Sequence, residues 1–277
     1  MSPAPAAPRT VLLTGAAGGV GSFLRASLPA EYGYDLRLFD QAPIEGEPEA
    51  ITAPLSDTAA LRKAAEGVDA IVHLAGISVE APFADILGAN IEGTYNLYKA
   101  ARAAGVRRVV FASSNHAVGF TERPEGAPES GATVPVETRL RPDTYYGLSK
   151  CFGENLASLY ADKHGIETVS IRIGSCFAKP RTVRMLDTWL SPADCHRLIH
   201  ASITAELPAH SHGHHVVYGI SANTRAWWSL DSAREIGFEP QDDSEVFAAE
   251  VIAELGELTP EDPEYRYFGG AFTQQQV

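Results

Sequence analysis

The feature that most constrains the fold is the segment TVLLTGAAGGVGS at residues 10–22. An apolar run typical of a buried strand is followed by glycines at positions 15, 18 and 21, and a helical pattern comes next. Glycine lets the turn tighten and the backbone approach a pyrophosphate, while the first turn of the helix offers N–H donors. A glycine turn without a ligand is the alternative, but this context favours a dinucleotide cradle. We expect its contacts to come from Gly15, Ala17, Gly18, Gly19, Val20 and Gly21.

The alternation of strand and helix continues to about residue 175. Apolar runs at 35–40, 69–76, 107–114 and 167–174 predict strands, and helical patterns lie at 19–30, 56–66, 83–104 and 145–164. Because the strand runs are continuously apolar, we expect them to be covered on both faces. The sequence therefore predicts an α/β fold with a doubly wound parallel sheet of the Rossmann type.

The chain divides into three unequal parts. Residues 1–9 predict a disordered lead, and residues 10–175 form the expected dinucleotide-binding domain. The alternation weakens over 176–277, where we expect helices at 192–205, 229–236 and 243–255 and a strand at 216–221. We interpret this part as a small substrate-covering lobe integrated with the first domain. The stretch 121–144, rich in Pro, Gly and Glu, predicts a surface loop or a flap near the active site.

Composition limits the partners and the compartment. The formal net charge of −13 disfavours nucleic acid and anionic membrane surfaces. Three cysteines without a CxxC spacing suit a reducing compartment. The first ten residues lack the apolar core of a secretory signal, and no apolar run approaches the length of a membrane span. We therefore expect a cytoplasmic protein.

The second and third strands carry the next dinucleotide contacts. Asp40 ends the second strand, where a carboxylate accepts hydrogen bonds from ribose hydroxyls and repels a 2′-phosphate, so NAD is favoured over NADP. Arg37, three residues earlier, keeps NADP open as an alternative. Asp57 is expected either to contact the adenine or to cap a helix. Close backbone approach after the third strand is expected from Leu74, Ala75 and Gly76.

A catalytic group is predicted from Tyr146, Lys150 and Ser114. On a helix, Tyr146 and Lys150 are four residues apart and share a face. A tyrosine hydroxyl has a pKa of about 10, and a neighbouring ammonium together with the positive nicotinamide favours its ionised form, which makes it a base. Ser114 ends the fourth strand and can hold a substrate oxygen. The alternative is a core tyrosine with an exposed lysine.

In this order, TGAAGGVG, Asp40, LAG, Asn90, SSN and YGLSK resemble the extended short-chain dehydrogenase/reductase family. The resemblance implies NAD as cofactor, a homo-oligomer, and catalytic roles for Ser114, Tyr146 and Lys150. It also implies that Asn90 supports the lysine. The further cofactor contacts that it implies are Asn90, Ser113, Tyr146, Lys150 and Cys176.

A narrower resemblance is to the uronate dehydrogenases within that family. It rests on HLAGISVEAPF, SSNHAVGF, YYGLSKCFGENLA, RIGSC, RML at 184–186, WWSL and FGGAF. It implies oxidation of galacturonate or glucuronate at C1 to the aldarolactone. Arg184 would grip the substrate carboxylate, as a planar guanidinium suits, and Arg181 is its rival. The implied substrate contacts are Ser78, Ser114, Asn115, His116, Tyr146, Ser175 and Arg184.

Other functions on this fold stay open from the sequence. A sugar-nucleotide epimerase or dehydratase needs a larger C-terminal lobe than the 102 residues after Ser175 provide. Another small-sugar dehydrogenase is a second alternative. An NAD-sensing protein is a third, although such proteins often lose the Tyr or the Lys. The histidines of AHSHGHH, at 210–215, lack a nearby acidic or Cys partner in the sequence, so we expect no metal.

Overall fold

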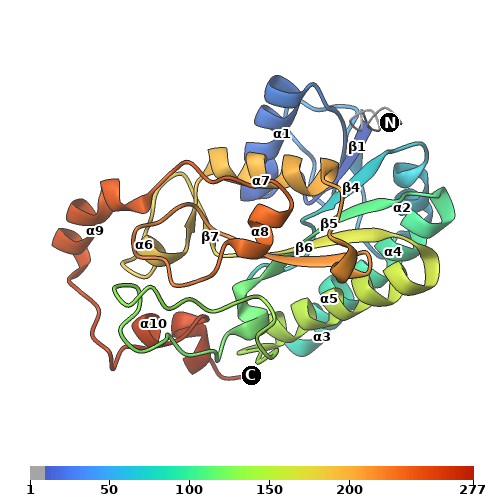
Figure 1. The fold of residues 1–277 in the computed structure, drawn as a ribbon. Coiled ribbons are helices and arrows are strands. Elements are labelled where there is room, and N and C mark those ends of the chain that lie inside the picture. Colours follow the sequence, from blue (N-terminus) through green and yellow to red (C-terminus); the bar gives the residue numbers. More distant parts are fainter. Residues whose placement is uncertain (1–9) are drawn as a thin grey trace.

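The computed structural model describes residues 10–277, so the expected lead at 1–9 lies outside the described part of the chain. A seven-stranded sheet in the order β3-β2-β1-β4-β5-β6-β9 forms the centre of the fold, and every pairing in it is parallel (Figure 1). The predicted doubly wound parallel sheet is thereby confirmed. The strands are β1 Thr10–Thr14, β2 Asp35–Asp40, β3 Ile51–Thr52, β4 Ala70–His73, β5 Arg108–Ser114, β6 Glu167–Ile173 and β9 His214–Gly219.

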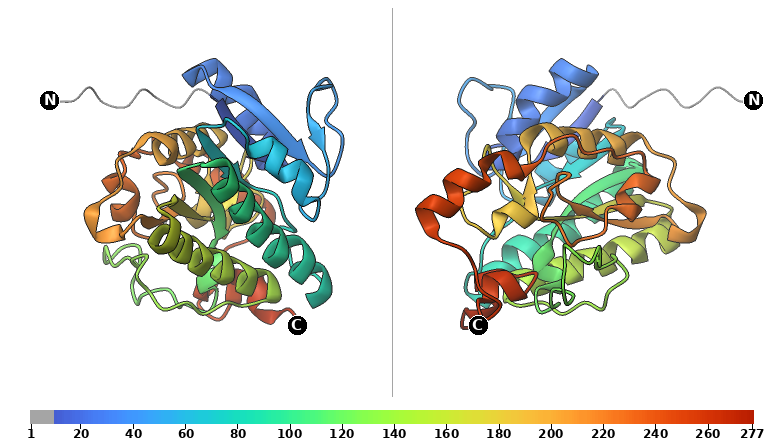
Figure 2. Two further views of the ribbon diagram at one scale, coloured as in Figure 1. Left: turned by 90° about the vertical axis from the view of Figure 1, so that its right-hand side faces the viewer. Right: turned by 60° about the vertical axis from the view of Figure 1, so that its left-hand side comes forward.

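Helices cover both faces of the sheet (Figure 2). On one face, α1 (Gly19–Tyr32) and α7 (Pro192–Thr204) pack against each other and enclose Val11 and Leu13 of β1. On the other face, α2 (Thr58–Ala65), α4 (Gly93–Ala104) and α5 (Tyr145–His164) enclose Leu12. Successive strand residues point to opposite faces, so a strand buried on both sides must be apolar throughout. This explains the continuous apolar runs in the sequence.

The helix boundaries follow from capping residues. Gly33, Gly105 and Gly165 end α1, α4 and α5 in the left-handed conformation, with φ of 68°, 73° and 64°. Glycine adopts this conformation without a Cβ penalty, so helices commonly stop at it. At the other end of α5, the Thr144 hydroxyl accepts a hydrogen bond from the Gly147 N–H at 3.0 Å. This N-cap fixes where the helix starts and thus where its first-turn side chains lie.

The helix predicted at 83–104 is interrupted. It consists of α3 (Phe83–Ile86), a π-helical segment η1 (Leu87–Glu92) and α4. Single π-helical turns inside α-helices are frequent at functional sites. Asn90, one of the residues implied by the resemblance, lies in this segment and is buried.

The sheet extends past residue 175. Both α7 and β9 belong to the layers of the main sheet, so part of the expected covering lobe completes the dinucleotide-binding fold. The sequence could not show this, because no local pattern states which strand a late strand pairs with. The remaining elements are β7 Ser175–Cys176, β8 Trp189–Leu190, α6 Met185–Thr188, α8 Asp231–Glu235, α9 Ala248–Leu255, α10 Pro263–Arg266, and 3-10 turns η2 Asn115–Val118, η3 Ala209–Ser211, η4 Ser244–Phe247 and η5 Gly270–Gln274.

The stretch 121–144 is a long loop attached to the C-terminal part of the chain. Val134 exchanges backbone hydrogen bonds with Trp227 (2.9 Å) and Ser229 (3.0 Å). Val134 and Val136 pack in an apolar cluster with Trp227, Trp228 and Phe268. Among residues 10–277, no helix has the length and apolar character needed to span a membrane.

Candidate active site

The glycine turn between β1 and α1 has the shape of a phosphate cradle. Gly15 has φ +73°, and a Cβ on it would lie 2.6 Å from the backbone nitrogen of Ala75. A Cβ on Gly21 would lie 2.3 Å from the Gly15 carbonyl oxygen. No side chain among the described residues caps the N-terminus of α1, so its first N–H groups are left for an anion. The cradle therefore fits a dinucleotide pyrophosphate.

Asp40 lies at the carboxyl end of β2, beside this turn. Its Oδ2 accepts a hydrogen bond from the Ala17 N–H, and its Oδ1 accepts one from the Ala42 N–H, both at 2.9 Å. Each carboxylate oxygen has two lone pairs, so both retain capacity for a ribose hydroxyl. Arg37 instead donates to the carbonyls of Ala64 (2.7 Å) and Glu66 (2.6 Å). The guanidinium of Arg37, which left NADP as an alternative cofactor, is thus held at the C-terminal end of α2.

Asp57 is the N-cap of α2, because its Oδ1 accepts a hydrogen bond from the Ala60 N–H at 2.9 Å. Its contact with an adenine stays a prediction.

Gly76 has φ +142°, and a Cβ there would lie 2.9 Å from Asn90 Oδ1. The positive φ and the short Cβ distance at Gly76 show that the backbone after β4 passes close to Asn90.

Asn90 connects this passage to α5. Its Oδ1 accepts from the Ile77 N–H at 2.7 Å, and its Nδ2 lies 3.0 Å from both the Ile77 carbonyl and Ser149 Oγ. Ser149 immediately precedes Lys150. Asn90 is therefore bound to the residue before the lysine, and its support of Lys150 stays a prediction.

Tyr146, Ser114 and Lys150 come together at the carboxyl end of β5. All three are buried, and the Ser114 and Tyr146 hydroxyls are hydrogen-bonded to each other. Lys150 Nζ donates to the Ala112 carbonyl at 2.8 Å and lies 5.4 Å from the Tyr146 ring centroid. Tyr145 turns away and packs on Phe83, with ring centroids 5.1 Å apart. Of the two neighbouring tyrosines, Tyr146 is therefore the one that lies beside Lys150, and its catalytic role stays a prediction.

Burial dominates the proton affinities of this group. It raises the pKa of Tyr146 to about 12, against the lowering effect of the Ser114 hydrogen bond, and Asp143 raises it further. Burial also lowers the pKa of Lys150 to about 8, which Glu154 opposes. In the chain alone, desolvation thus favours the neutral phenol, and the role of Tyr146 as a base stays a prediction that includes the positive charge of the nicotinamide. A further positive charge is needed next to the phenol.

A buried ion pair that sequence reasoning missed lies behind Lys150. Arg172 makes two hydrogen bonds of 2.9 Å to the Glu154 carboxylate. Ser113 Oγ donates to the same carboxylate at 2.6 Å. The hydroxyl hydrogen of Ser113 is therefore used within the protein, and its cofactor contact stays a prediction. The sequence feature that could have indicated this ion pair is Glu154, a carboxylate that follows Lys150 by one helical turn.

The predicted substrate contacts converge on the C-terminal segment 268–272, whose FGGAF sequence is part of the resemblance. Asn115 Nδ2 donates to the Phe268 carbonyl at 2.7 Å, and Arg184 donates to the same oxygen. His116 stacks on Phe272, with ring centroids 4.1 Å apart. This segment therefore joins three of the predicted residues.

The other predicted contacts are placed differently. Ser175 Oγ is hydrogen-bonded to Thr188 Oγ1 at 3.0 Å and is buried. Ser78 lies exposed on the loop after β4. Cys176 is buried beside Cys195, whose pKa it raises, and its cofactor contact stays a prediction. Arg181, the rival of Arg184, stacks on Phe177 with 3.9 Å between its guanidinium carbon and the ring centroid.

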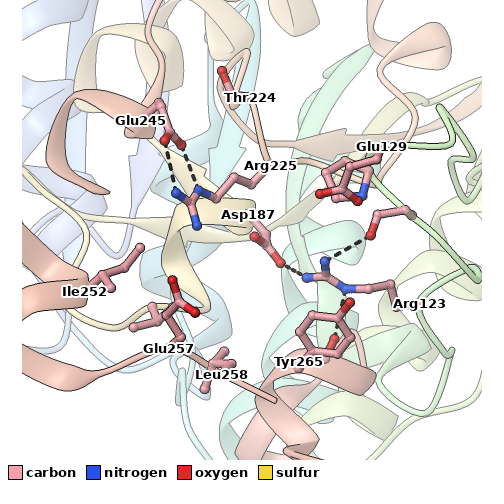
Figure 3. Close-up of a pocket in the computed structure, with 13 residues that line it drawn as sticks. Arg123, Glu129, Asp187, Thr224, Arg225, Glu245, Ile252, Glu257, Leu258 and Tyr265 are labelled. Carbon is pink, nitrogen blue, oxygen red and sulfur yellow. Dashed lines mark hydrogen bonds and ion pairs between the residues drawn. The ribbon is translucent and has the colours of Figure 1, made fainter. Parts of the chain in front are cut away.

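A separate pocket of about 610 Å³ lies between the 121–144 loop and the C-terminal part of the chain (Figure 3). Arg123 and Asp187 form an ion pair across it, and Arg225 is paired with Glu245 at 2.7 Å. None of the predicted site residues lines this pocket. Both arginine charges are already compensated, so the pocket offers no free cationic group to a sugar acid.

The histidine stretch at 210–215 does gain an acidic neighbour in space. Ligand atoms of His210, His215 and Glu235 lie within 4.8 Å of one another. However, His215 Nε2 also lies 2.8 Å from the Ser232 carbonyl, which only accepts hydrogen bonds. This nitrogen therefore carries a hydrogen and has no lone pair for a metal.

Comparisons with known proteins place the chain in a family. A family model described as the NAD dependent epimerase/dehydratase family matches residues 11–204. The uronate dehydrogenase of Pseudomonas syringae pv. tomato is 48% identical over 267 residues, which cover 95% of this chain and 92% of that protein. The uronate dehydrogenase of Agrobacterium fabrum is 43% identical, covering 97% of this chain and 98% of that protein.

Solved structures agree with these relatives. A mutant of the uronate dehydrogenase from Agrobacterium tumefaciens, complexed with NAD, superposes with a TM-score of 0.87 at 40% identity. The match covers 97% of this chain and 98% of that chain. Both resemblances inferred from the sequence motifs are confirmed. The chain belongs to the NAD dependent epimerase/dehydratase family.

Proposed function

We propose that this chain is a uronate dehydrogenase, which oxidises C1 of a cyclic hexuronate such as galacturonate or glucuronate to the aldarolactone with NAD. One arrangement carries the proposal beyond the likeness to named relatives. The guanidinium of Arg184 and the amide of Asn115 share the Phe268 carbonyl. His116 stacks on Phe272 of the same segment and packs on Tyr146. A carboxylate-binding group thus belongs to the same cluster as the proposed base.

NAD, when bound, accepts the hydride that leaves C1. Tyr146 takes the proton of the C1 hydroxyl, and Ser114 holds the oxygen from which that proton leaves. Because burial raises the pKa of Tyr146 to about 12, its ionisation needs the combined positive charge of Lys150 and the nicotinamide. Lys150 is held by the Ala112 carbonyl, so its ammonium stays close to the ring.

Arg184 supplies the local positive charge that a chain of net charge −13 needs for an anionic substrate. A guanidinium offers parallel N–H donors to a carboxylate, which fixes orientation as well as affinity. Ser175 adds a buried hydroxyl, which is hydrogen-bonded to Thr188, one helical turn after Arg184. We propose that these two residues orient the sugar ring so that C1 lies at Tyr146.

We further propose a cytoplasmic homo-oligomer that has a small sugar acid, and neither nucleic acid nor membrane, as its partner. The acidic charge, the three free cysteines and the family resemblance support this proposal. The part of the chain after residue 175 is proposed to cover the substrate.

The role of Tyr146 as the base can be tested by replacing Tyr146 and, separately, its neighbour Tyr145. Tyr146→Phe should lower kcat by about 10²- to 10⁴-fold, the usual contribution of a general base, while the Kd for NAD changes little. Tyr145→Phe is the matched control, because that ring packs on Phe83. Near-full turnover by Tyr146→Phe would show that the proton leaves by another route.

A further inference from the structure

A buried Asp–His pair lies against the proposed base. His116 Nδ1 is 2.7 Å from Asp143 Oδ2, and the Asp143 side chain is fully buried. The imidazole packs edge-on against Tyr146, with ring centroids 5.6 Å apart, and stacks on Phe272 from the C-terminal segment. The ring is thus fixed between the base and the segment that joins the predicted substrate contacts.

The carboxylate of Asp143 lies in a niche lined by three glycines. A Cβ on Gly119 or Gly269 would lie 2.1 Å or 1.8 Å from Oδ2, and a Cβ on Gly147 would lie 3.0 Å from Oδ1. The Thr144 hydroxyl donates to Oδ1 at 2.9 Å. Three separate segments therefore leave space for this side chain, and both of its oxygens have a defined partner.

This geometry sets the tautomer of His116. A carboxylate only accepts hydrogen bonds, so the hydrogen must be on Nδ1 and Nε2 must carry a lone pair. Burial lowers the pKa of His116 and Arg184 lowers it further, while Asp143 raises it. The neutral ring is therefore favoured near neutral pH. Among residues 10–277, Nε2 has no hydrogen-bond partner, which leaves it for a ligand.

We propose that Asp143 is a positioning residue that holds His116 as a hydrogen-bond acceptor for a hydroxyl of the sugar ring, next to the C1 hydroxyl at Tyr146. The inference rests on the proposed function. An imidazole fixed in this way selects a substrate that donates a hydroxyl at one position of the ring. A site with such a buried acceptor discriminates strongly against an analogue that lacks the donor.

Asp143→Asn reverses the hydrogen bond without emptying the niche. The Thr144 hydroxyl still needs an acceptor at Oδ1, so the amide oxygen stays there and the amide nitrogen faces His116 Nδ1. Nδ1 must then accept, and Nε2 becomes a donor. Changing the tautomer of a histidine in this way leaves the geometry intact but impairs its role.

The kinetic test compares Asp143→Asn with Asp162→Asn, which removes the same charge from an exposed position on α5. With galacturonate or glucuronate, Asp143→Asn should lower kcat/KM by about 10- to 100-fold, mainly through KM, and leave the Kd for NAD unchanged. The acid limb of kcat/KM should also move to lower pH, because the charge that raises the pKa of His116 is gone. Asp162→Asn should behave as the wild type.

Ring-nitrogen NMR of ¹⁵N-histidine-labelled protein reads the tautomer without any activity, and His116→Gln assigns the signal. We expect Nδ1–H in the wild type and Nε2–H in Asp143→Asn. Nε2–H in the wild type would overturn the inference, even if the variant does not fold. So would a kcat/KM for Asp143→Asn within twofold of the wild type. If the wild type oxidises no uronate, the proposed function fails, and the NMR result still decides what Asp143 does to His116.

Discussion

The guanidinium of Arg184 donates a hydrogen bond to the backbone carbonyl of Phe268. This contact links the residue expected to grip the substrate carboxylate to a segment 84 positions later in the chain. Gly270 closes the other side, because a Cβ there would lie 2.6 Å from Arg184 Cδ. An arginine has five N–H donors in a fixed plane, so one bond to the protein still leaves a fork for a carboxylate.

Arg184→Lys is expected to weaken binding of a uronate while it retains the charge. A lysine cannot bind Phe268 and both carboxylate oxygens in one plane, so KM should rise by about 10- to 100-fold, in proportion to the loss of one or two charged hydrogen bonds. Steady-state kinetics with glucuronate and glucose measures this, since glucose lacks the carboxylate. Arg181→Lys is the control, and an equal loss in both variants would assign the carboxylate to neither arginine.

Asp40 should control the choice between NAD and NADP. Replacing it by Asn removes the charge that repels a 2′-phosphate and weakens the hydrogen bonds to the ribose. The ratio of kcat/KM for NAD to that for NADP should fall by about 10-fold or more, as expected for hydrogen bonds to a charged group. An unchanged ratio would mean that Asp40 serves the Ala17 and Ala42 amides alone.

Gly15 and Gly33 distinguish two reasons for a glycine, which are a backbone conformation with positive φ and the close approach of a neighbouring segment. Gly15 and Gly33 both have positive φ, but only a Cβ on Gly15 meets a neighbour, Ala75. Gly33→Ala should cost about 1–2 kcal/mol of stability and leave NAD affinity intact. Gly15→Ala should lose NAD binding as well, measured by calorimetry. Equal NAD affinity in the two variants would contradict the cradle.

The buried His73 and the half-buried His214 predict a loss of stability in acid. Burial lowers the pKa of His73 to about 3 and of His214 to about 4. Both values lie below those of the unfolded chain, so the neutral forms contribute stability above about pH 6.5, and it is lost as the pH falls from there. Each should reduce the free energy of unfolding by about 1.4 kcal/mol per pH unit in this window.

Thermal unfolding between about pH 7 and pH 5 measures that slope. His214→Gln should flatten it, whereas His164→Gln, at an exposed position near the end of α5, should not. If all three proteins lose stability equally, other groups cause the acid sensitivity.

Local patterns account for what the sequence predicted well. The glycine turn, the apolar strands and the glycines that end α1, α4 and α5 each depend on neighbours in the chain. The pairing of Tyr146 with Lys150 depends on one helical turn. Such features can be derived because the physical cause and the residue lie within a few positions of each other.

Long-range partners could not be derived in the same way. Asp143 meets His116 across 27 positions, and Phe268 meets Asn115 across 153. Nor does any local pattern place β9 beside β6. The raised pKa of Tyr146 also depends on burial by several segments, which spacing alone cannot show.

The most direct test of the account is NADH formation by the purified protein, followed by its ultraviolet absorbance. NAD would be supplied with galacturonate, glucuronate, glucose or UDP-glucuronate in parallel. We expect rapid reduction of NAD with the two free uronates and little with glucose or the nucleotide sugar. No reduction with either free uronate, or reduction with UDP-glucuronate alone, would contradict it.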